Sequence, residues 1–152
     1  MTWSFAIKDG DLSLGGSSFA TVTGRQKLYQ DLRHYVLDRV GNDQLHPGYG
    51  SLIDGGIRPD GQFVDSPIGT YDWDETQFEI ESELTRILTE YQYRQLERAE
   101  EDKARYGKIT LTAEEIISAV GGIEFHQDTD KLTVVVSIST AAGNRLDIPF
   151  EF

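Results

Sequence analysis

The sequence contains no cysteine, no long apolar run and few basic residues, and each absence excludes a class of protein. Without cysteine, the 152 residues can form no disulfide, zinc–thiolate site or catalytic thiol. No apolar stretch approaches the roughly 20 residues that span a bilayer. The first ten residues also lack the basic and apolar regions of a signal peptide. We therefore expect a protein made in the cytoplasm, with no membrane partner.

Basic residues are outnumbered, with 14 lysines and arginines against 26 acids and a formal net charge of −12. Nine acids lie between Asp54 and Glu83, where Arg58 is the one base. Nucleic acid binding needs clustered lysine and arginine, so we expect no nucleic acid partner. An acidic surface is compatible with simple solvation or with a basic protein partner, and composition leaves both open.

The remaining composition, 38% hydrophobic and 26% charged, is that of one folded domain with a thin core. We expect a single domain over 1–152, with an N-terminal arm at 1–19 and a C-terminal β-meander at 123–152. The predicted fold class is α+β. It has two main helices, at about 24–40 and 75–106, packed with a small antiparallel C-terminal sheet and an N-terminal strand or arm.

The N-terminal arm has two parts. Trp3, Phe5 and Ile7 alternate with small or polar residues, which predicts a half-buried strand. The glycine-rich segment 12–19 predicts an irregular, flexible continuation.

The first helix is marked at both ends, by Thr23 as N-cap and by Gly41 as a residue able to adopt positive φ. Its apolar stripe predicts a core-facing helix. The stripe contains Leu28, Leu32, Tyr35, Val36 and Val40. His34 lies off this stripe with no second histidine one turn away, so no metal role is expected for it.

The long segment 42–71 is rich in glycine and proline, which predicts a loop with one short strand at 62–64. Tyr49, Leu52 and Ile53 are expected to anchor it on the first helix. His46 lies near Tyr49, but no nucleophile with an orienting acid accompanies them, so no catalytic pair is expected.

The second helix begins after Asp72 or Asp74, either of which can act as N-cap. Its first half carries an apolar stripe, and its second half is highly charged. We expect this second half to project, or to pack against another chain. The predicted stripe contains Phe78, Leu84, Ile87, Leu88 and Tyr91.

Beyond the second helix, Thr112 and Glu115 have the spacing of a capping box, which predicts a short helix to about Ala119. Strands are expected at 123–126, 132–140 and 145–152. Pro149 cannot donate to a strand ladder, so the last strand is expected at an edge of the sheet. Its unpaired backbone groups would then be open to a foreign strand.

Several motifs in the first third of the chain resemble one family. They are ATVTG at 20–24, RQKLYQDLRHYVL at 25–37, GND at 41–43 and HPGYGSL at 46–52. Together they resemble the phage baseplate wedge and sheath-initiator family typified by gene product 25 of phage T4. The family's Glu-Pro-Arg motif near the end of the second helix is absent here. The matching motif residues are Gly24, Gln30, Leu32, Pro47, Tyr49 and Gly50.

The resemblance implies a structural protein of the virion, in the tail baseplate, with no catalytic residue, metal or cofactor. It implies as partners the tail sheath protein, the baseplate wedge proteins and the tail tube, with about six copies per baseplate. The last strand would meet the sheath, so the expected contact residues are Arg145, Leu146, Ile148, Phe150 and Phe152.

Two alternatives remain from the sequence. Members of the family have been described as tail lysozymes, and a glycosidase needs two carboxylates of which one has a raised pKa. With 26 acids a pair can always be found, so the sequence carries no specific signal for it. The other alternative is an adaptor of a non-viral contractile injection system.

Overall fold

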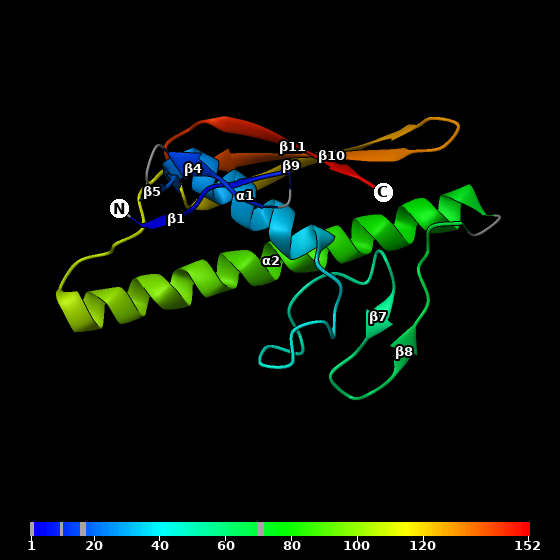
Figure 1. Ribbon diagram of the computed structural model, residues 1–152, viewed down its shortest axis with the longest axis horizontal. Helices are drawn as coiled ribbons and strands as arrows, with labels where there is room; N and C mark the ends of the chain where they lie inside the picture. Colours follow the sequence, from blue (N-terminus) through cyan, green and yellow to red (C-terminus); the bar gives the residue numbers. More distant parts are fainter. Residues whose placement is uncertain (1, 10, 16–17, 70–71) are drawn as a thin grey trace.

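The computed structural model describes residues 2–9, 11–15, 18–69 and 72–152. Two helices and a three-stranded antiparallel sheet surround one core, which confirms the α+β class (Figure 1). Residues 1, 10, 16, 17, 70 and 71 of the predicted arm and loop lie outside the described residues. The elements are β1 (Trp3–Phe5), β2 (Ile7–Lys8), β3 (Asp11–Leu12), β4 (Leu14–Gly15), β5 (Ser18–Phe19), β6 (Thr21–Thr23), α1 (Gly24–Leu37), β7 (Gly56–Ile57), β8 (Phe63–Val64), α2 (Trp73–Tyr106), β9 (Ile117–Gln127), β10 (Leu132–Thr140) and β11 (Arg145–Glu151).

Helix α1 buries the predicted stripe, and its residues Leu28, Leu32, Tyr35 and Val36 are each at most 2% exposed. It ends at Leu37, earlier than predicted, because Asp38 adopts an extended conformation with φ −79° and ψ 141°. Val40 is nevertheless buried, in the segment that follows the helix.

Helix α2 begins where Asp72 accepts hydrogen bonds from the backbone N–H groups of Asp74 and Glu75. It ends at Gly107, which adopts the left-handed conformation with φ 70°. Its 34 residues make a helix of about 51 Å at roughly 1.5 Å per residue. Phe78 was predicted on the buried stripe and is 72% exposed. Ile80 is fully buried instead, because it shares a face with the core residues of the next two turns.

The second half of α2 is tied to its own chain by one buried amide. The side chain of Gln95 donates to the backbone carbonyl of Glu115 at 2.5 Å and accepts from the N–H of Ile117 at 3.0 Å. Asp102 further along accepts from the N–H of Thr110 at 3.1 Å. This half therefore packs in part on the segment that leads into the sheet, while its last turns extend past the sheet in Figure 1.

The C-terminal sheet has the order β11-β10-β9. The predicted short helix to Ala119 is wrong, because β9 already begins at Ile117, which pairs with Thr140. The Thr112–Glu115 contact does form, with the N–H of Thr112 donating to the Glu115 carboxylate at 2.7 Å. It closes a turn and not a helix, because strand pairing with β10 takes over two residues later.

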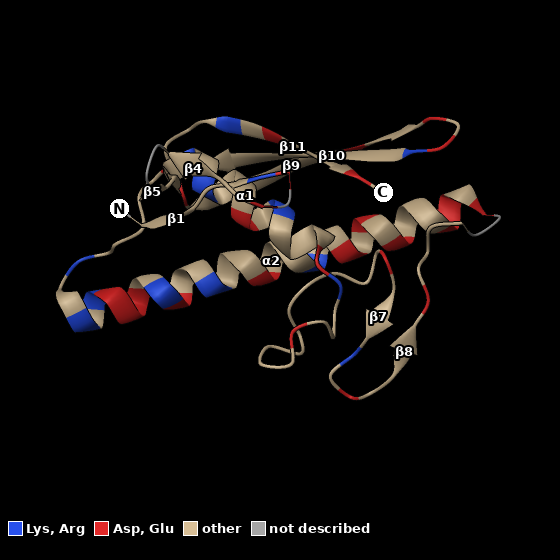
Figure 2. Cartoon of the chain, in the orientation of Figure 1, with Lys and Arg blue, Asp and Glu red and all other residues tan. Residues whose placement is uncertain are grey.

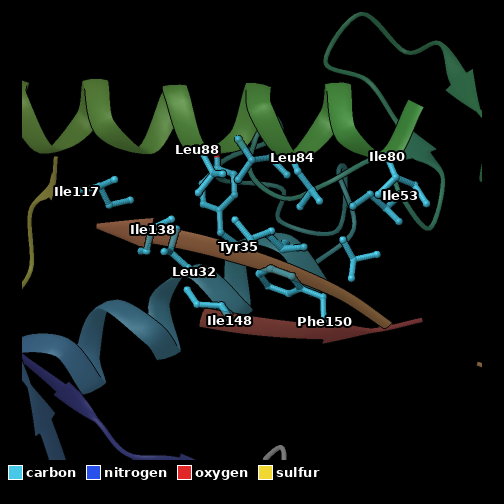
Figure 3. Packing of buried hydrophobic residues seen from close by; sticks show 14 of the residues in the cluster. Leu32, Tyr35, Ile53, Ile80, Leu84, Leu88, Ile117, Ile138, Ile148 and Phe150 are labelled. Atoms are coloured by element: carbon cyan, nitrogen blue, oxygen red, sulfur yellow. The ribbon is translucent and has the colours of Figure 1, made fainter. Parts of the chain in front are cut away.

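The core lies between the helices and one face of the sheet, and close packing is visible between α2 and β10 (Figure 3). From the sheet it takes alternate residues of β10 and β11, as the period of a strand requires. These are Val134, Val136, Ile138, Ile148 and Phe150.

The loop between the helices is anchored as predicted. The ring of Tyr49 lies edge-on to that of Tyr35, with centroids 4.4 Å apart, and Ile53 is fully buried. The predicted strand at 62–64 corresponds to β8, whose partner β7 was not expected.

The described residues between Trp3 and Thr23 form three short antiparallel ladders, and we call this unit the clover. Its ladders are β1–β6, β2–β3 and β4–β5. They meet at Ala6, Ser13 and Ala20, which are joined in a ring by three backbone hydrogen bonds of 2.8 Å each. The segment 12–19 is therefore paired where it is described, and the prediction of an irregular arm is wrong. Trp3 and Phe5 are 60% and 44% exposed, so the predicted half-buried face is also wrong.

Candidate strand-docking edge

The last strand, β11, lies at an edge of the sheet, as predicted. Phe152 and Leu132 exchange both backbone hydrogen bonds, at 2.9 and 3.1 Å. Because antiparallel bonding alternates, Phe150, Ile148 and Leu146 also bond to β10. The backbone groups of the intervening residues point away from the sheet. These residues are Arg145, Asp147, Pro149 and Glu151.

Pro149 fits this alternation, since the N–H that proline lacks would have pointed outward. Its carbonyl accepts a hydrogen bond of 3.2 Å from the guanidinium of Arg33 on α1. Arg33 is held in turn by the hydroxyl of Tyr29 at 3.1 Å. The middle of the edge is thus covered by one side chain, with outward N–H and C=O groups on either side of it.

The side chains of β11 have other roles than the sequence suggested. Ile148 and Phe150 are 1% and 2% exposed and belong to the core (Figure 3). Leu146 and Phe152 are half-buried against the same core. The expectation that the side chains of Ile148 and Phe150 contact the sheath therefore needs correction, because the protein's own interior holds both.

The outer face of the edge carries a small polar network. Asp147 accepts from the hydroxyl of Ser137 at 2.6 Å and from Nε of Arg145 at 2.9 Å. These two donors lower the pKa of Asp147. The sequence-based prediction did not single out Asp147 and Glu151. Pro149 was the available signal, because the backbone groups of residues two positions away point outward like its own.

A groove of about 980 Å³ runs along the outer side of α1, next to this edge. Arg33 and Leu146 belong to both the groove and the edge. Although the protein is acidic, the groove holds Lys8, Arg25 and Arg33 against Asp9 and Asp38. An extended segment placed beside β11 would therefore meet a partly apolar wall with a slight excess of positive charge.

The family-motif residues support the scaffold around this groove. Gln30 accepts from the N–H of Ile7 at 2.9 Å and donates to the carbonyl of Phe5 at 2.7 Å, which fixes the clover to α1. Leu32 is fully buried in the core, and Gly24 is buried at the start of α1.

The loop part of the motif lies apart from the edge. Gly50 has φ 104°, and a Cβ there would lie 2.7 Å from the carbonyl oxygen of Asp38, so the close approach of the loop to the end of α1 requires glycine. Tyr49 packs on Tyr35, whereas Pro47 is exposed. These residues hold the loop and do not contact β11.

The carboxyl groups with shifted pKa values do not include the general acid that a glycosidase needs. The carboxyl groups with shifted pKa values are Asp43, Asp102, Glu115 and Asp147, and all are lowered. Each accepts hydrogen bonds that favour its charged form, whereas a general acid requires a raised pKa. In the described part of the chain, no group of three or more histidines and acids could hold a metal ion.

Figure 2 shows acidic and basic residues spread along α2, and they alternate most densely in its second half. Among the described residues, no helix is long and apolar enough to cross a membrane.

Comparisons of the chain with protein-family models, curated proteins and solved structures find no match.

Proposed function

We propose that the protein is a non-catalytic structural component of a contractile-tail baseplate in a virion. In this role it joins the wedge proteins around the tail tube, in about six copies, and starts assembly of the sheath. Sheath subunits would add to β11 as further strands, through main-chain hydrogen bonds.

The observation that carries the proposal is the open edge of β11. Outward N–H and C=O groups lie at Arg145, Asp147 and Glu151, and the adjacent groove leaves room for an extended segment. Exposed strand edges are normally blocked in proteins that act alone. Here α1 lies beside β11 and covers the Pro149 carbonyl through the bond from Arg33, and we propose that the outward groups on either side of Pro149 stay accessible.

The length of α2 supports the attachment to wedge proteins. Its outer side exposes Phe78, Tyr93 and Leu96, at 72%, 61% and 63%. Between Phe78 and Tyr93 the same side carries Ser82 and Thr89, so this stripe is uncharged although the helix as a whole is highly charged. An uncharged, partly apolar helix face is suited to packing against a helix of another protein.

The same edge would serve an adaptor of a non-viral contractile injection system, which uses a sheath of the same kind. The neighbouring genes separate these two settings, since a virion requires capsid and terminase genes nearby. A hydrolase finds no support in the lowered carboxyl pKa values.

Cross-linking mass spectrometry on assembled tails tests the proposal. Lys131 reports on the edge because its ammonium lies 3.6 Å from the Glu151 carboxylate at the end of β11. We expect links from Lys131 to sheath subunits. Links from Lys131 to wedge proteins alone, with sheath assembly unchanged when β11 is altered, would contradict the proposed sheath contact.

A further inference from the structure

The clover segregates its residues into two unlike faces. In its ladders Phe5 pairs with Thr21, Ile7 with Leu12 and Leu14 with Phe19, and directly paired residues point to the same side. Alternation along each strand adds Trp3 to this side. The result is one face with six large apolar side chains, which we call the apolar face. They are Trp3, Phe5, Ile7, Leu12, Leu14 and Phe19, with exposed fractions of 36% to 67%.

The reverse face carries the charge. Lys8 pairs with Asp11 there, and each is the chain neighbour of an apolar residue that points to the opposite side. Small or half-buried residues such as Ser4, Ala6 and Val22 occupy the rest. The apolar face therefore has no charged side chain, on a protein whose formal net charge is −12.

The aromatic part of the apolar face is continuous and held in place. The rings of Trp3 and Phe5 lie 5.5 Å apart, and those of Phe5 and Phe19 lie 5.6 Å apart, both edge-on. The Gln30 side chain bonds to the backbone on both sides of Ala6, and the ring of three backbone bonds joins the ladders. A surface fixed in this way loses little conformational entropy when it binds.

The area of this face is sufficient for a stable interface. An aromatic side chain buries about 150–250 Å², so the six residues at their observed exposure offer roughly 600 Å². Two such faces together would bury about 1,200 Å², the lower bound for specific protein–protein interfaces. A patch of this size is at the upper end of what monomers expose.

The charge distribution indicates which kind of partner fits the apolar face. A membrane surface is disfavoured, because the clover carries Lys8 against Asp9 and Asp11, and the acidic protein would be repelled by anionic lipid. A strongly charged partner would have to desolvate its charges with nothing to pair them. A second copy brings an equally uncharged apolar face, and face-to-face packing keeps the acidic segment 54–83 of each copy out of the contact.

We propose that the apolar face of the clover binds the same face of a second copy, in a two-fold symmetric contact. The contact is isologous, which means that the same surface of each copy meets the same surface of the other. It uses no residue of β11, although Ile7 also lines the groove beside that strand.

Sedimentation equilibrium of the intact protein tests this pairing. We expect a monomer–dimer equilibrium in the micromolar range or tighter. Leu14→Ser, at a position 67% exposed, is expected to weaken the dimer roughly tenfold or more, while leaving the thermal melt of the monomer, measured at concentrations too low for the dimer to form, unchanged. Leu45→Ser is the matched control, since Leu45 is 86% exposed and lies outside the clover.

Tryptophan fluorescence identifies the surface involved. In a Trp73→Phe background Trp3 is the remaining tryptophan. Its emission is expected to shift to the blue as protein concentration rises, and Leu14→Ser is expected to remove the shift. A protein that stays monomeric well above micromolar concentration would overturn the proposal, as would a dimer that Leu14→Ser leaves intact. A blue shift with neutral phosphatidylcholine vesicles but not with protein concentration would assign the face to lipid instead.

Discussion

Arg33 on α1 and Pro149 on β11 are joined by a hydrogen bond of 3.2 Å, from the guanidinium to the backbone carbonyl. The bond joins residues that are 116 positions apart in the chain, and it covers the outward carbonyl at the middle of the sheet edge. A strand that adds to β11 along its full length would need this carbonyl as an acceptor. Arg33 therefore restrains the edge at which the sheath is proposed to assemble.

Replacing Arg33 by methionine keeps the aliphatic part of the side chain and removes the donor. The free energy of unfolding is expected to fall by about 1 kcal/mol, because the bonds to Pro149 and Tyr29 are lost and both are partly exposed. Association with sheath subunits should become faster, because the Pro149 carbonyl is free. Light scattering during sheath assembly measures the rate. An unchanged or slower rate would show that the Arg33 bond does not restrain the edge.

Replacing Gln30 by leucine is expected to loosen the clover and leave the core intact. The variant loses the bonds to Ile7 and Phe5, at a cost of about 1 kcal/mol. Hydrogen exchange should show faster exchange of the Ile7 amide and unchanged exchange within β10. Gln26→Leu, on the exposed side of α1, is the control. Equal protection of Ile7 in both variants would contradict the role of Gln30.

Replacing Gln95 by leucine is expected to destabilise the whole domain. The change leaves the Ile117 N–H and the Glu115 carbonyl without their partner at a buried position, at a cost of about 2–4 kcal/mol. Gln92→Leu loses one long contact of 3.4 Å to the Ile117 carbonyl and should cost under about 1 kcal/mol. Urea unfolding measures both, and similar losses in the two variants would contradict this assignment.

Glu115 should make stability depend on pH. Burial alone would raise its pKa, but hydrogen bonds from Thr2 and Thr112 outweigh this effect and lower the pKa in the folded protein. A lowered pKa stabilises the fold above the ordinary value of 4.5, and this contribution is lost as the pH falls through the folded value. The difference in unfolding free energy between the native protein and Glu115→Gln should therefore shrink below about pH 4. A difference in unfolding free energy that stays constant between pH 3 and pH 7 would contradict this role of Glu115.

The helices were largely predictable, because their buried stripes follow from spacing alone. Leu28, Leu32 and Leu84 lie in the core as expected. The end of α1 was not predictable, because it depends on a distant contact. The N–H of Ser51 donates to the Asp38 carbonyl at 2.8 Å, which draws that residue out of the helix.

The alternation of apolar and polar residues at the N-terminus correctly predicted a strand. It did not predict that the apolar side chains are exposed. Trp3, Phe5 and Ile7 do share a face, but a strand pattern shows only that two faces differ. Which face meets the protein depends on the Gln30 contacts to α1. The clover had a visible sequence signal in Ala6, Ser13 and Ala20, small residues spaced seven apart.

The candidate site was predicted in position and not in detail. Pro149 placed the last strand at an edge, as the structure confirms. The expected contact residues were those of the last strand, and two of them, Ile148 and Phe150, belong to the core. The direction of each backbone group follows from pairing with β10, which links segments that the sequence alone does not align.

Proline at Asp147 tests the central claim most directly. Asp147→Pro removes an outward N–H without breaking a backbone bond to β10, and Asp147→Ala loses the same side-chain bond to Ser137 while keeping that N–H. Glu151→Pro with Glu151→Ala forms a second pair beyond Pro149. If sheath strands add to β11, both proline variants should melt like their alanine controls yet start sheath assembly poorly in a co-assembly assay. Normal sheath assembly with both proline variants would contradict the proposed strand addition.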